Sequence, residues 1–206
     1  MRFDAATGKI CGTLVHDDPR GHGRGSIAFL STLGYSPILS DYAERKEDGS
    51  FCSRNLGPGK YYLYFVHRDE SGASALYYPG VTEVAKATPI EVRAGEIQSN
   101  LVFHVRKQAS YSVRGFISAE DRSAFDSELV QTSIGLIRSD GDMRVWYNAK
   151  TKLRLLPRSA YFKVDDVVPG RYFVVVQTSA GWMTRKVAVD VTTHSKFISV
   201  DLMRKR

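Results

Sequence analysis

The chain has 206 residues, which suits one large domain or two domains of about 100 residues with a core each. Its 43% hydrophobic and 11% aromatic residues exclude an intrinsically disordered chain. The longest apolar runs, Tyr61–Val66 and Tyr172–Val176, are too short to cross a bilayer, and the N-terminal MRFDAATGKICG has no apolar signal-peptide core. These features predict a globular cytosolic chain, unless the sequence is a segment of a longer protein.

The net charge of +7 is unevenly distributed. Residues 1–106 carry 12 Lys or Arg and 12 Asp or Glu, whereas residues 107–206 carry 17 and 10. The second half therefore holds the whole net charge, and we expect any anionic partner to bind there.

The first half has the pattern of short strands separated by turns. Ile10 and Leu14 alternate with polar residues on one strand face. The expected elements are strands at Ile10–Val15, Ser26–Thr32, Ser36–Ser40, Ile90–Val92 and Leu101–Val105, a polar Gly-rich loop at Asp17–Gly25, a hairpin turn at Asp48-Gly49 and an aromatic surface turn at Tyr77–Gly80.

The second half repeats this plan. Val113–Ile117 matches Ile10–Leu14, and Thr132–Ser139 matches the second strand. The remaining matches are a hairpin turn at Asp140-Gly141, Val187 and Val189 for Ile90 and Val92, and Ile198, Val200 and Leu202 for Leu101, Phe103 and Val105. No stretch of ten or more residues keeps a helical period.

The clearest repeat is Asp48–Val66, DGSFCSRNLGPGKYYLYFV, which returns 111 positions later as Ser159–Gln177. Pro-Gly favours a type II turn, and the Tyr two residues after the Gly could bond its hydroxyl to the backbone as a tyrosine corner. The shared framework residues are Phe51, Pro58, Gly59 and Tyr61 in the first copy and Phe162, Pro169, Gly170 and Tyr172 in the second. We therefore expect two all-β antiparallel sandwiches in tandem, residues 1–107 and 108–206.

This order of strands around Gly-x-Phe and Leu-x-Pro-Gly-x-Tyr resembles the carboxypeptidase regulatory-like domain, whose sandwich is transthyretin-like and close to the Cna-B modules of bacterial surface proteins. The resemblance covers nearly the whole chain twice, with Ala160 in place of Gly49 in the second copy. It implies a bacterial extracellular or cell-envelope setting and a framework without a catalytic set.

Two groups of side chains carry metal-binding atoms. His67 and Glu70 match the His-x-x-Glu pattern of zinc carboxypeptidases, with His194 far downstream, but those enzymes build the site on an α/β fold. The other group is the loop set His16, Asp17, Asp18 and His22, whose spacing matches no defined site.

Catalytic and nucleotide motifs are equally weak. Gly21, Gly23 and Gly25 match neither G-x-G-x-x-G nor a P-loop, and no Ser, Cys or Thr has a nucleophile signature. We therefore expect no enzyme activity, no metal and no cofactor.

The two cysteines, Cys11 and Cys52, each alternate with inward-facing residues and so point away from the core. A disulfide needs their Cα atoms within about 7 Å. The sequence does not give the strand order, so a disulfide and two free thiols both remain open, and we favour free thiols.

A basic stretch of the second half surrounds Trp146 and Tyr147. Its cations are Arg138, Arg144, Lys150, Lys152, Arg154 and Arg158, opposed by Asp140 and Asp142. Cations beside aromatic rings suit an acidic polysaccharide, an anionic surface or single-stranded nucleic acid, whereas the alternative is a solvated basic face. The candidate ligand surface is Arg144, Trp146, Tyr147, Lys150, Lys152 and Arg154.

Two functions remain open. The first is a non-catalytic structural or interaction module of a larger secreted or envelope protein, with other envelope proteins as partners. The alternative is a carbohydrate-binding module, for which the candidate aromatics are Tyr77, Tyr78, Trp146, Tyr147 and Trp182. We expect no nucleic-acid partner, because no reader motif is present.

Overall fold

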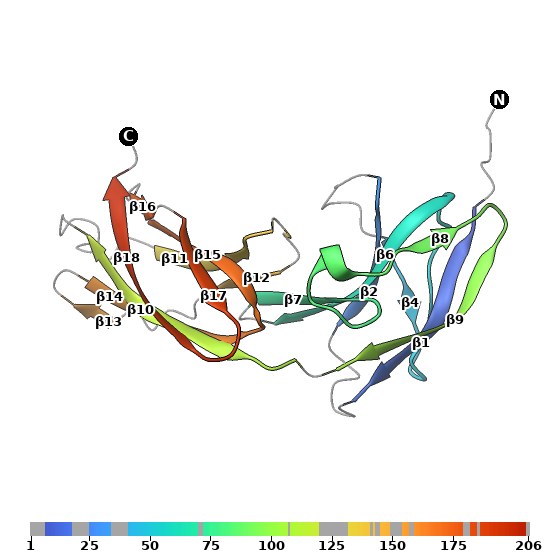
Figure 1. Ribbon diagram of the computed structural model, residues 1–206, viewed down its shortest axis with the longest axis horizontal. Helices are drawn as coiled ribbons and strands as arrows, with labels where there is room; N and C mark the ends of the chain where they lie inside the picture. The colour runs from blue at the N-terminus through green and yellow to red at the C-terminus, as the bar shows by residue number, and fades with distance from the viewer. Residues whose placement is uncertain are drawn as a thin grey trace. The chain divides into compact units, whose positions relative to one another are not determined.

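The computed structural model consists of short β-strands joined by turns (Figure 1). The described residues are 7–17, 25–33, 41–69, 72–106, 108–119, 132–140, 142, 145–148, 154–156, 159–178, 182–184 and 186–204. Among them the helical structure is limited to one 3₁₀ turn, η2 (Val84–Lys86). The all-β class predicted from the sequence is therefore confirmed.

The chain divides into two compact units, one of residues 1–68 and 74–107 and one of residues 69–73 and 108–206. The strands up to residue 107 are β1 (Lys9–His16), β2 (Ser26–Ser31), β3 (Asp41–Tyr42), β4 (Glu44–Arg45), β5 (Ser50–Cys52), β6 (Gly59–Asp69), β7 (Gly72–Tyr77), β8 (Ile90–Val92) and β9 (Ile97–Val105). The later strands are β10 (Tyr111–Ala119), β11 (Thr132–Arg138), β12 (Trp146–Asn148), β13 (Arg154–Leu156), β14 (Ser159–Val167), β15 (Gly170–Thr178), β16 (Trp182–Thr184), β17 (Val187–Val191) and β18 (Lys196–Arg204).

The first unit is built from two sheets. One has the strand order β4-β5-β1-β9, with β1 antiparallel to β5 and parallel to β9. The other is centred on β6, which pairs with β2, β7 and β8, while β3 pairs with β2.

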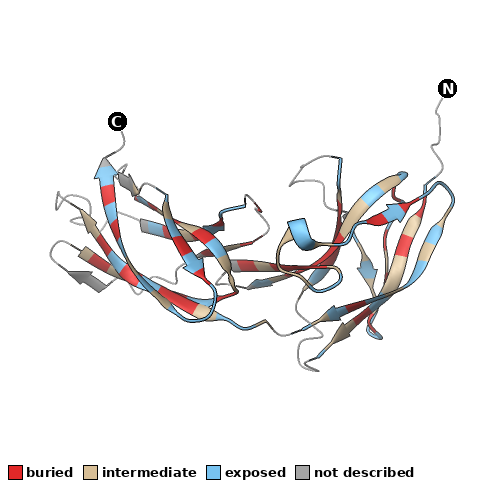
Figure 2. Cartoon of the chain, viewed as in Figure 1, coloured by how far each residue is buried: buried red, intermediate tan, exposed pale blue. Residues whose placement is uncertain are grey.

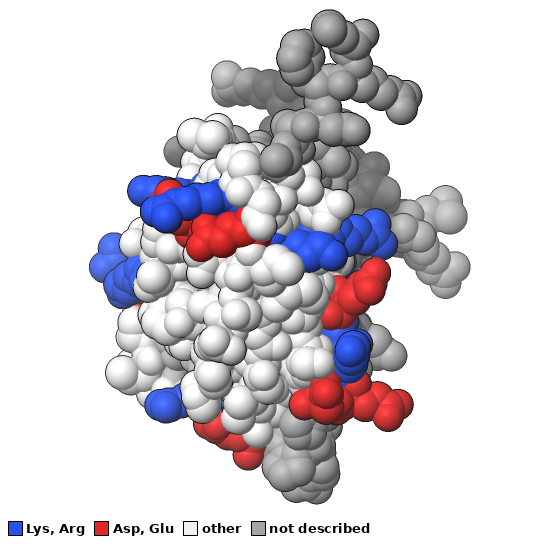
Figure 3. Space-filling model, turned by 90° about the vertical axis from the view of Figure 1, so that its right-hand side faces the viewer, with Lys and Arg blue, Asp and Glu red and all other residues white. Residues whose placement is uncertain are grey.

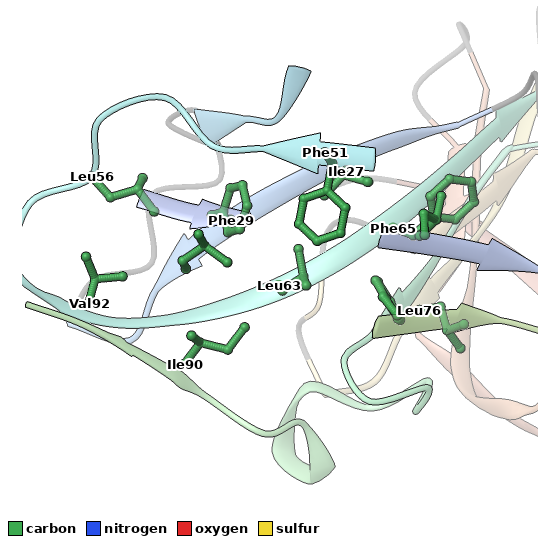
Figure 4. Packing of buried hydrophobic residues seen from close by; sticks show 12 residues of the cluster. Ile27, Phe29, Phe51, Leu56, Leu63, Phe65, Leu76, Ile90 and Val92 are labelled. Carbon is green, nitrogen blue, oxygen red and sulfur yellow. The ribbon is translucent and has the colours of Figure 1, made fainter. Parts of the chain in front are cut away.

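Both sheets of the first unit contribute to one core. Side chains alternate between the two faces of a strand, so every second residue points inward. Leu14 and Phe51 from one sheet belong to the same buried cluster as Phe29, Leu63 and other residues of the second sheet (Figure 4). Each such side chain contributes about 1.5–3 kcal/mol when it is fully buried, so this shared core accounts for the sandwich.

The second unit repeats most of these strand pairings, except that β16 pairs with both β15 and β18 and so joins its two sheets at one edge. The order β13-β14-β10-β18 corresponds to β4-β5-β1-β9, including the parallel pair of first and last strands. Likewise β15 pairs with β11 and β17, and β11 pairs with β12. Buried and exposed residues alternate along β15 and β18 (Figure 2), as expected for strands with one face on a core.

A glycine and a phenylalanine hold equivalent places in the two units. Gly12 lies opposite Phe51, and Gly115 lies opposite Phe162. A Cβ on Gly12 would lie 2.3 Å from the Leu101 carbonyl oxygen, and one on Gly115 would lie 2.0 Å from that of Ile198. Both phenylalanine rings are buried, so the backbone approach and the ring above it together exclude any side chain at these glycines.

The tyrosine corner is present in both units. Tyr61 Oη donates to the Gly57 carbonyl oxygen at 2.8 Å, and Tyr172 Oη donates to that of Val168 at 2.8 Å. Tyr172 is fully buried, whereas Tyr61 is only partly buried, so the two rings are not equivalent in burial.

The turn expected before these tyrosines differs from type II. Gly59 has a φ of 158°, close to extended backbone, and the φ of Gly170 lies outside the left-handed range. Both glycines begin a strand instead. Gly170 has little room for a side chain, because a Cβ would lie 2.8 Å from Arg138 Nη1 and 3.1 Å from Tyr172 Oη.

Two further sequence matches need correction or explanation. Tyr61 pairs with Ile90 and Tyr172 pairs with Val189, so Ile90 corresponds to Val189, two residues later than predicted. Gly49 has a φ of 85° in the turn between β4 and β5, whereas Ala160 lies within the longer strand β14. The replacement of glycine by alanine therefore follows from the loss of a left-handed position.

Candidate functional site

The structure describes part of the candidate basic surface. Trp146 lies on β12 and is partly exposed. The backbone of Arg154 lies on β13. The remaining cations of this surface, Arg144, Lys150 and Lys152, and the side chain of Arg154 lie outside the described residues.

The predicted exposure of Tyr147 is wrong. Its ring is 4% exposed and meets the ring of Tyr172 edge-on, with centroids 5.9 Å apart. Its hydroxyl accepts a hydrogen bond from the Val168 backbone N–H at 3.2 Å. Tyr147 therefore supports the tyrosine corner of the second unit and is not available as a flat ring for a ligand.

Arg138 is likewise a core residue and not a surface cation. Its side chain is 3% exposed, and Nη2 lies 2.7 Å from Asp140 Oδ2. Burial opposes the charged form, but the hydrogen bonds and charge of Asp140 outweigh it and raise the pKa of Arg138. Burial acts to raise the pKa of Asp140 and is the largest single effect, but the hydrogen bonds from Arg138 and the Asp142 backbone N–H, together with the charge of Arg138, outweigh it and lower the pKa. This pair belongs to the fold, so the expected basic surface loses one of its cations.

The candidate stacking aromatics of the first unit also serve the core. Tyr77 is fully buried, which corrects the predicted surface turn. Tyr78 is partly buried and meets Phe103 edge-on, with ring centroids 6.0 Å apart. The side chain of Trp182, from the second unit, lies outside the described residues.

An exposed aromatic group lies elsewhere, on the outer face of β14, β10 and β18. We call Tyr161, Phe116 and Phe197 the aromatic surface. The Phe116 centroid lies 5.7 Å from that of Tyr161 and 5.6 Å from that of Phe197, with the ring planes inclined at 67° and 72°. Phe116 is 37% exposed and Phe197 is 64% exposed. Sequence reasoning missed this group, although the alternation of Phe116 with Gly115 and Ile117 signals an outward position.

The polar side chains around the aromatic surface carry both signs of charge. Lys163 Nζ lies 2.7 Å from Asp165 Oδ1, and both side chains are about half exposed. Arg114 is exposed and donates from Nε to the Ser112 hydroxyl. Ser118 donates to the carboxylate of Asp201. Among its described side chains this face therefore combines apolar rings with hydrogen-bond donors and acceptors of both charges.

The described acidic and basic side chains of the first unit are mixed on the side that carries β8 and β9 (Figure 3). Figure 3 views that side and shows acidic and basic side chains next to one another around an uncharged surface. This agrees with the equal numbers of acidic and basic residues in the first half of the sequence.

The metal candidates are dispersed or lie beyond what the structure describes. Glu70, Asp18 and His22 are outside the described residues. His194 is exposed and contacts Thr193 and Lys196, at 3.0 and 3.1 Å from its ring nitrogens. Within the described ranges no three His, Cys, Asp or Glu side chains come close enough to hold a metal ion.

The cysteines form a disulfide between neighbouring strands. Cys11 and Cys52 lie directly opposite each other on β1 and β5, with their Cα atoms 4.1 Å apart. Free thiols, the alternative that we favoured, are therefore wrong. The pairing depends on the strand order, which the sequence pattern did not provide.

The described part of the chain contains no helix with the length and apolar character that crossing a membrane requires.

Comparison with known proteins gives likenesses to solved structures alone. No protein-family model matches the chain, and no curated protein matches it. Among solved structures, the Bacillus anthracis TIE protein is 13% identical with a TM-score of 0.30, over 95% of this chain and 33% of that one. A leucine-rich repeat protein from Bacteroides thetaiotaomicron is 12% identical with a TM-score of 0.34, over 95% and 26%. A streptococcal ancillary pilin is 12% identical with a TM-score of 0.29, over 94% and 68%.

The chain spans a third or less of the first two of these proteins. At these TM-scores we base no argument on the likenesses.

Proposed function

We propose that the chain is a pair of carboxypeptidase regulatory-like sandwiches, residues 1–107 and 108–206, that serves as a non-catalytic structural or interaction module of a larger secreted or cell-envelope protein. The observation that supports this most directly is the repeated framework. Gly12 with Phe51 and Gly115 with Phe162 occupy the same register in the two units. The residues that the two halves share thus account for packing and turns. The ionisable members of this shared set are Tyr61 and Tyr172, and both hydroxyls donate to backbone carbonyls within the fold.

The disulfide supports the proposed setting. Disulfides form and persist in secreted and envelope proteins and are rare in reducing cytosol. Cys11 and Cys52 close a loop across two adjacent strands of the first unit. We propose an oxidising compartment for the chain, in place of the cytosol that the missing signal-peptide core suggested.

Carbohydrate binding is the second candidate function, and the aromatic surface favours it. Large apolar rings at the solvent-exposed face of a sheet add nothing to the core and are typical of interaction sites. The basic residues around Trp146 remain a proposed additional contact for a ligand of the second unit.

The test of the proposed function compares turnover with binding for the purified full chain. Ester, peptide and glycosidic substrates should remain unchanged after prolonged incubation. Isolated cell envelopes and insoluble polysaccharides should be assayed by co-sedimentation in parallel. Turnover that co-purifies with the chain and disappears on a single substitution would refute the non-catalytic assignment.

The proposed compartment has its own measurement. Whole cells that produce the full-length parent protein are treated with a thiol-alkylating reagent before and after reduction. We expect Cys11 and Cys52 to be alkylated only after reduction. Alkylation without reduction would place the chain in a reducing compartment and contradict the proposal.

A further inference from the structure

The repeated fold provides an internal comparison for the aromatic surface. One residue beyond Gly115 and Phe162, the second unit pairs Phe116 with Tyr161. One residue beyond Gly12 and Phe51, the first unit pairs Thr13 with Ser50. The same strand pairing is therefore made without aromatic rings, and the fold itself does not require them.

The next outward pair differs in the same way. Arg114 lies opposite Lys163 in the second unit, where the first unit has the disulfide of Cys11 and Cys52. The third ring, Phe197, lies opposite Arg114 on β18. In the first unit the register of β9 shifts at the equivalent point, where Asn100 has a φ of 68°. Both outward pairs that flank the shared glycine and phenylalanine have thus diverged, while that inward pair is kept.

The rings of Phe116 and Phe197 point away from the core and so contribute little to its stability. Val113 and Ile117 of β10 are fully buried, so the alternation of the strand directs Phe116 away from the core. Phe197 leaves nearly two thirds of its surface in water. Phe116 contacts both Tyr161 and Phe197, so the three rings form a contiguous apolar patch, and such patches on soluble proteins commonly mark a binding site.

The charges beside the rings indicate what kind of ligand fits. Among the side chains that the structure describes, Arg114 and Lys163 are balanced by Asp165 and Asp201, so these four groups together offer no net attraction to an anion. A protein partner would have to cover these charges, and charged residues are depleted at the centre of protein interfaces because their desolvation is costly. A ligand that presents hydroxyl groups can donate to the carboxylates and accept from the cations without carrying a charge itself.

The rings define the other half of the ligand. An aromatic face is apolar and carries a negative electrostatic potential, which suits weakly positive C–H groups. A sugar ring has such a C–H face and is surrounded by hydroxyl groups. Rings from three neighbouring strands, each about 4.8 Å from the next, extend over more than one sugar and therefore suit a chain over a monosaccharide.

We propose that the outer face of β14, β10 and β18 binds a neutral polysaccharide chain. Phe116, Tyr161 and Phe197 pack against successive sugar rings through their exposed faces and edges, and the polar groups of Arg114, Lys163 and Asp201 bind the hydroxyls. This inference rests on the proposed function, of which it specifies the ligand class and the site. The first unit lacks these groups and contributes no equivalent site.

The test is affinity gel electrophoresis of the full chain in gels that contain hydroxyethylcellulose, glucomannan or soluble starch. The double variant Phe116→Thr/Tyr161→Ser introduces the residues of the first unit at the same positions, so it should fold. Phe197→Ser is a second, independent variant. Tyr42→Ser is the matched control, because Tyr42 is 47% exposed on β3 of the first unit.

We expect at least one of these neutral polysaccharides to retard the wild-type chain. The affinity of the double variant for that polysaccharide should be at least about tenfold lower than that of the wild type, and the affinity of Phe197→Ser should be about threefold lower. The thermal unfolding temperature should be unchanged in both variants. Tyr42→Ser should bind like the wild type.

Several outcomes would overturn the proposal. These are no retardation by any of the three polysaccharides, equal binding of wild type and double variant, or retardation only by acidic alginate in a salt-sensitive manner. Light scattering that shows a dimer dissociated by the double variant would instead assign the face to a second copy of the chain. None of these results implies turnover, so each leaves the non-catalytic assignment to be judged by its own assay.

Discussion

The two tyrosine corners form a matched pair in which only burial differs. Each hydroxyl donates a 2.8 Å hydrogen bond to the carbonyl oxygen four residues earlier. Tyr61 donates to Gly57, and Tyr172 donates to Val168. Tyr172 and Val168 are buried, whereas Gly57 is exposed. Burial also raises the pKa of the Tyr172 phenol above its ordinary value, so that the group stays a donor at any physiological pH.

This difference predicts unequal effects of the same substitution. Tyr172→Phe removes the hydroxyl and leaves the buried Val168 carbonyl without this hydrogen bond, which should lower the free energy of unfolding by about 1–3 kcal/mol. Tyr61→Phe leaves the Gly57 carbonyl able to bond water, so we expect a loss below about 1 kcal/mol. The ring volume is kept in both variants, so neither creates a core cavity.

The assay is urea unfolding of the full chain, followed by tryptophan fluorescence and far-UV circular dichroism. The two units can unfold in separate transitions, so each transition is fitted on its own. The free energies of unfolding of variant and wild type are then compared with the same dependence on urea concentration. Equal losses for the two variants, or a larger loss for Tyr61→Phe, would refute the reasoning that burial sets the cost.

Three further predictions use the same measurement. Phe51→Ala and Phe162→Ala should each cost about 3–5 kcal/mol, because both rings are buried in the core of their unit; losses below about 1 kcal/mol would contradict the shared framework. Asp140→Asn should cost about 1.5–3 kcal/mol at pH 7, because it removes the charged partner of the buried Arg138. The pKa of Asp140 is lowered in the folded state, so this contribution is present above its unfolded pKa of about 3.9 and is lost as the pH falls through the folded value; the difference between variant and wild type should therefore shrink in acid. Cys52→Ser should cost about 2–4 kcal/mol through the lost disulfide, and an unchanged midpoint under oxidising conditions would argue against the bond.

Local patterns were sufficient for the inner faces of the strands. A glycine followed two residues later by an apolar side chain, and a Pro-Gly followed by a tyrosine, recur in both halves and lie in equivalent registers in the structure. These features depend on neighbours in the sequence or on alternation, which a sequence displays directly.

The errors arose where side chains meet across strands. Cys11 and Cys52 are 41 residues apart, and only the adjacency of β1 and β5 brings their Cα atoms to 4.1 Å. Arg138 and Tyr147 look like surface groups in a basic stretch, yet both are held beneath the Tyr172 corner, with Arg138 5.8 Å from the Tyr172 ring centroid. A buried cation paired with a nearby acid cannot be told from an exposed one by composition.

The aromatic surface also could not be predicted, because the sequence does not give the strand order. Its three rings come from residues 116, 161 and 197, and nothing in the sequence places these side by side until β10 is known to lie between β14 and β18. Once the order is known, the repeat makes the comparison informative. Inward positions of the two units hold the same kinds of residue because one core geometry constrains both. Outward positions are free of that constraint, and there the second unit has Phe116 and Tyr161 where the first has Thr13 and Ser50. In a chain whose shared residues all serve the framework, the differences between its two halves are the better guide to function.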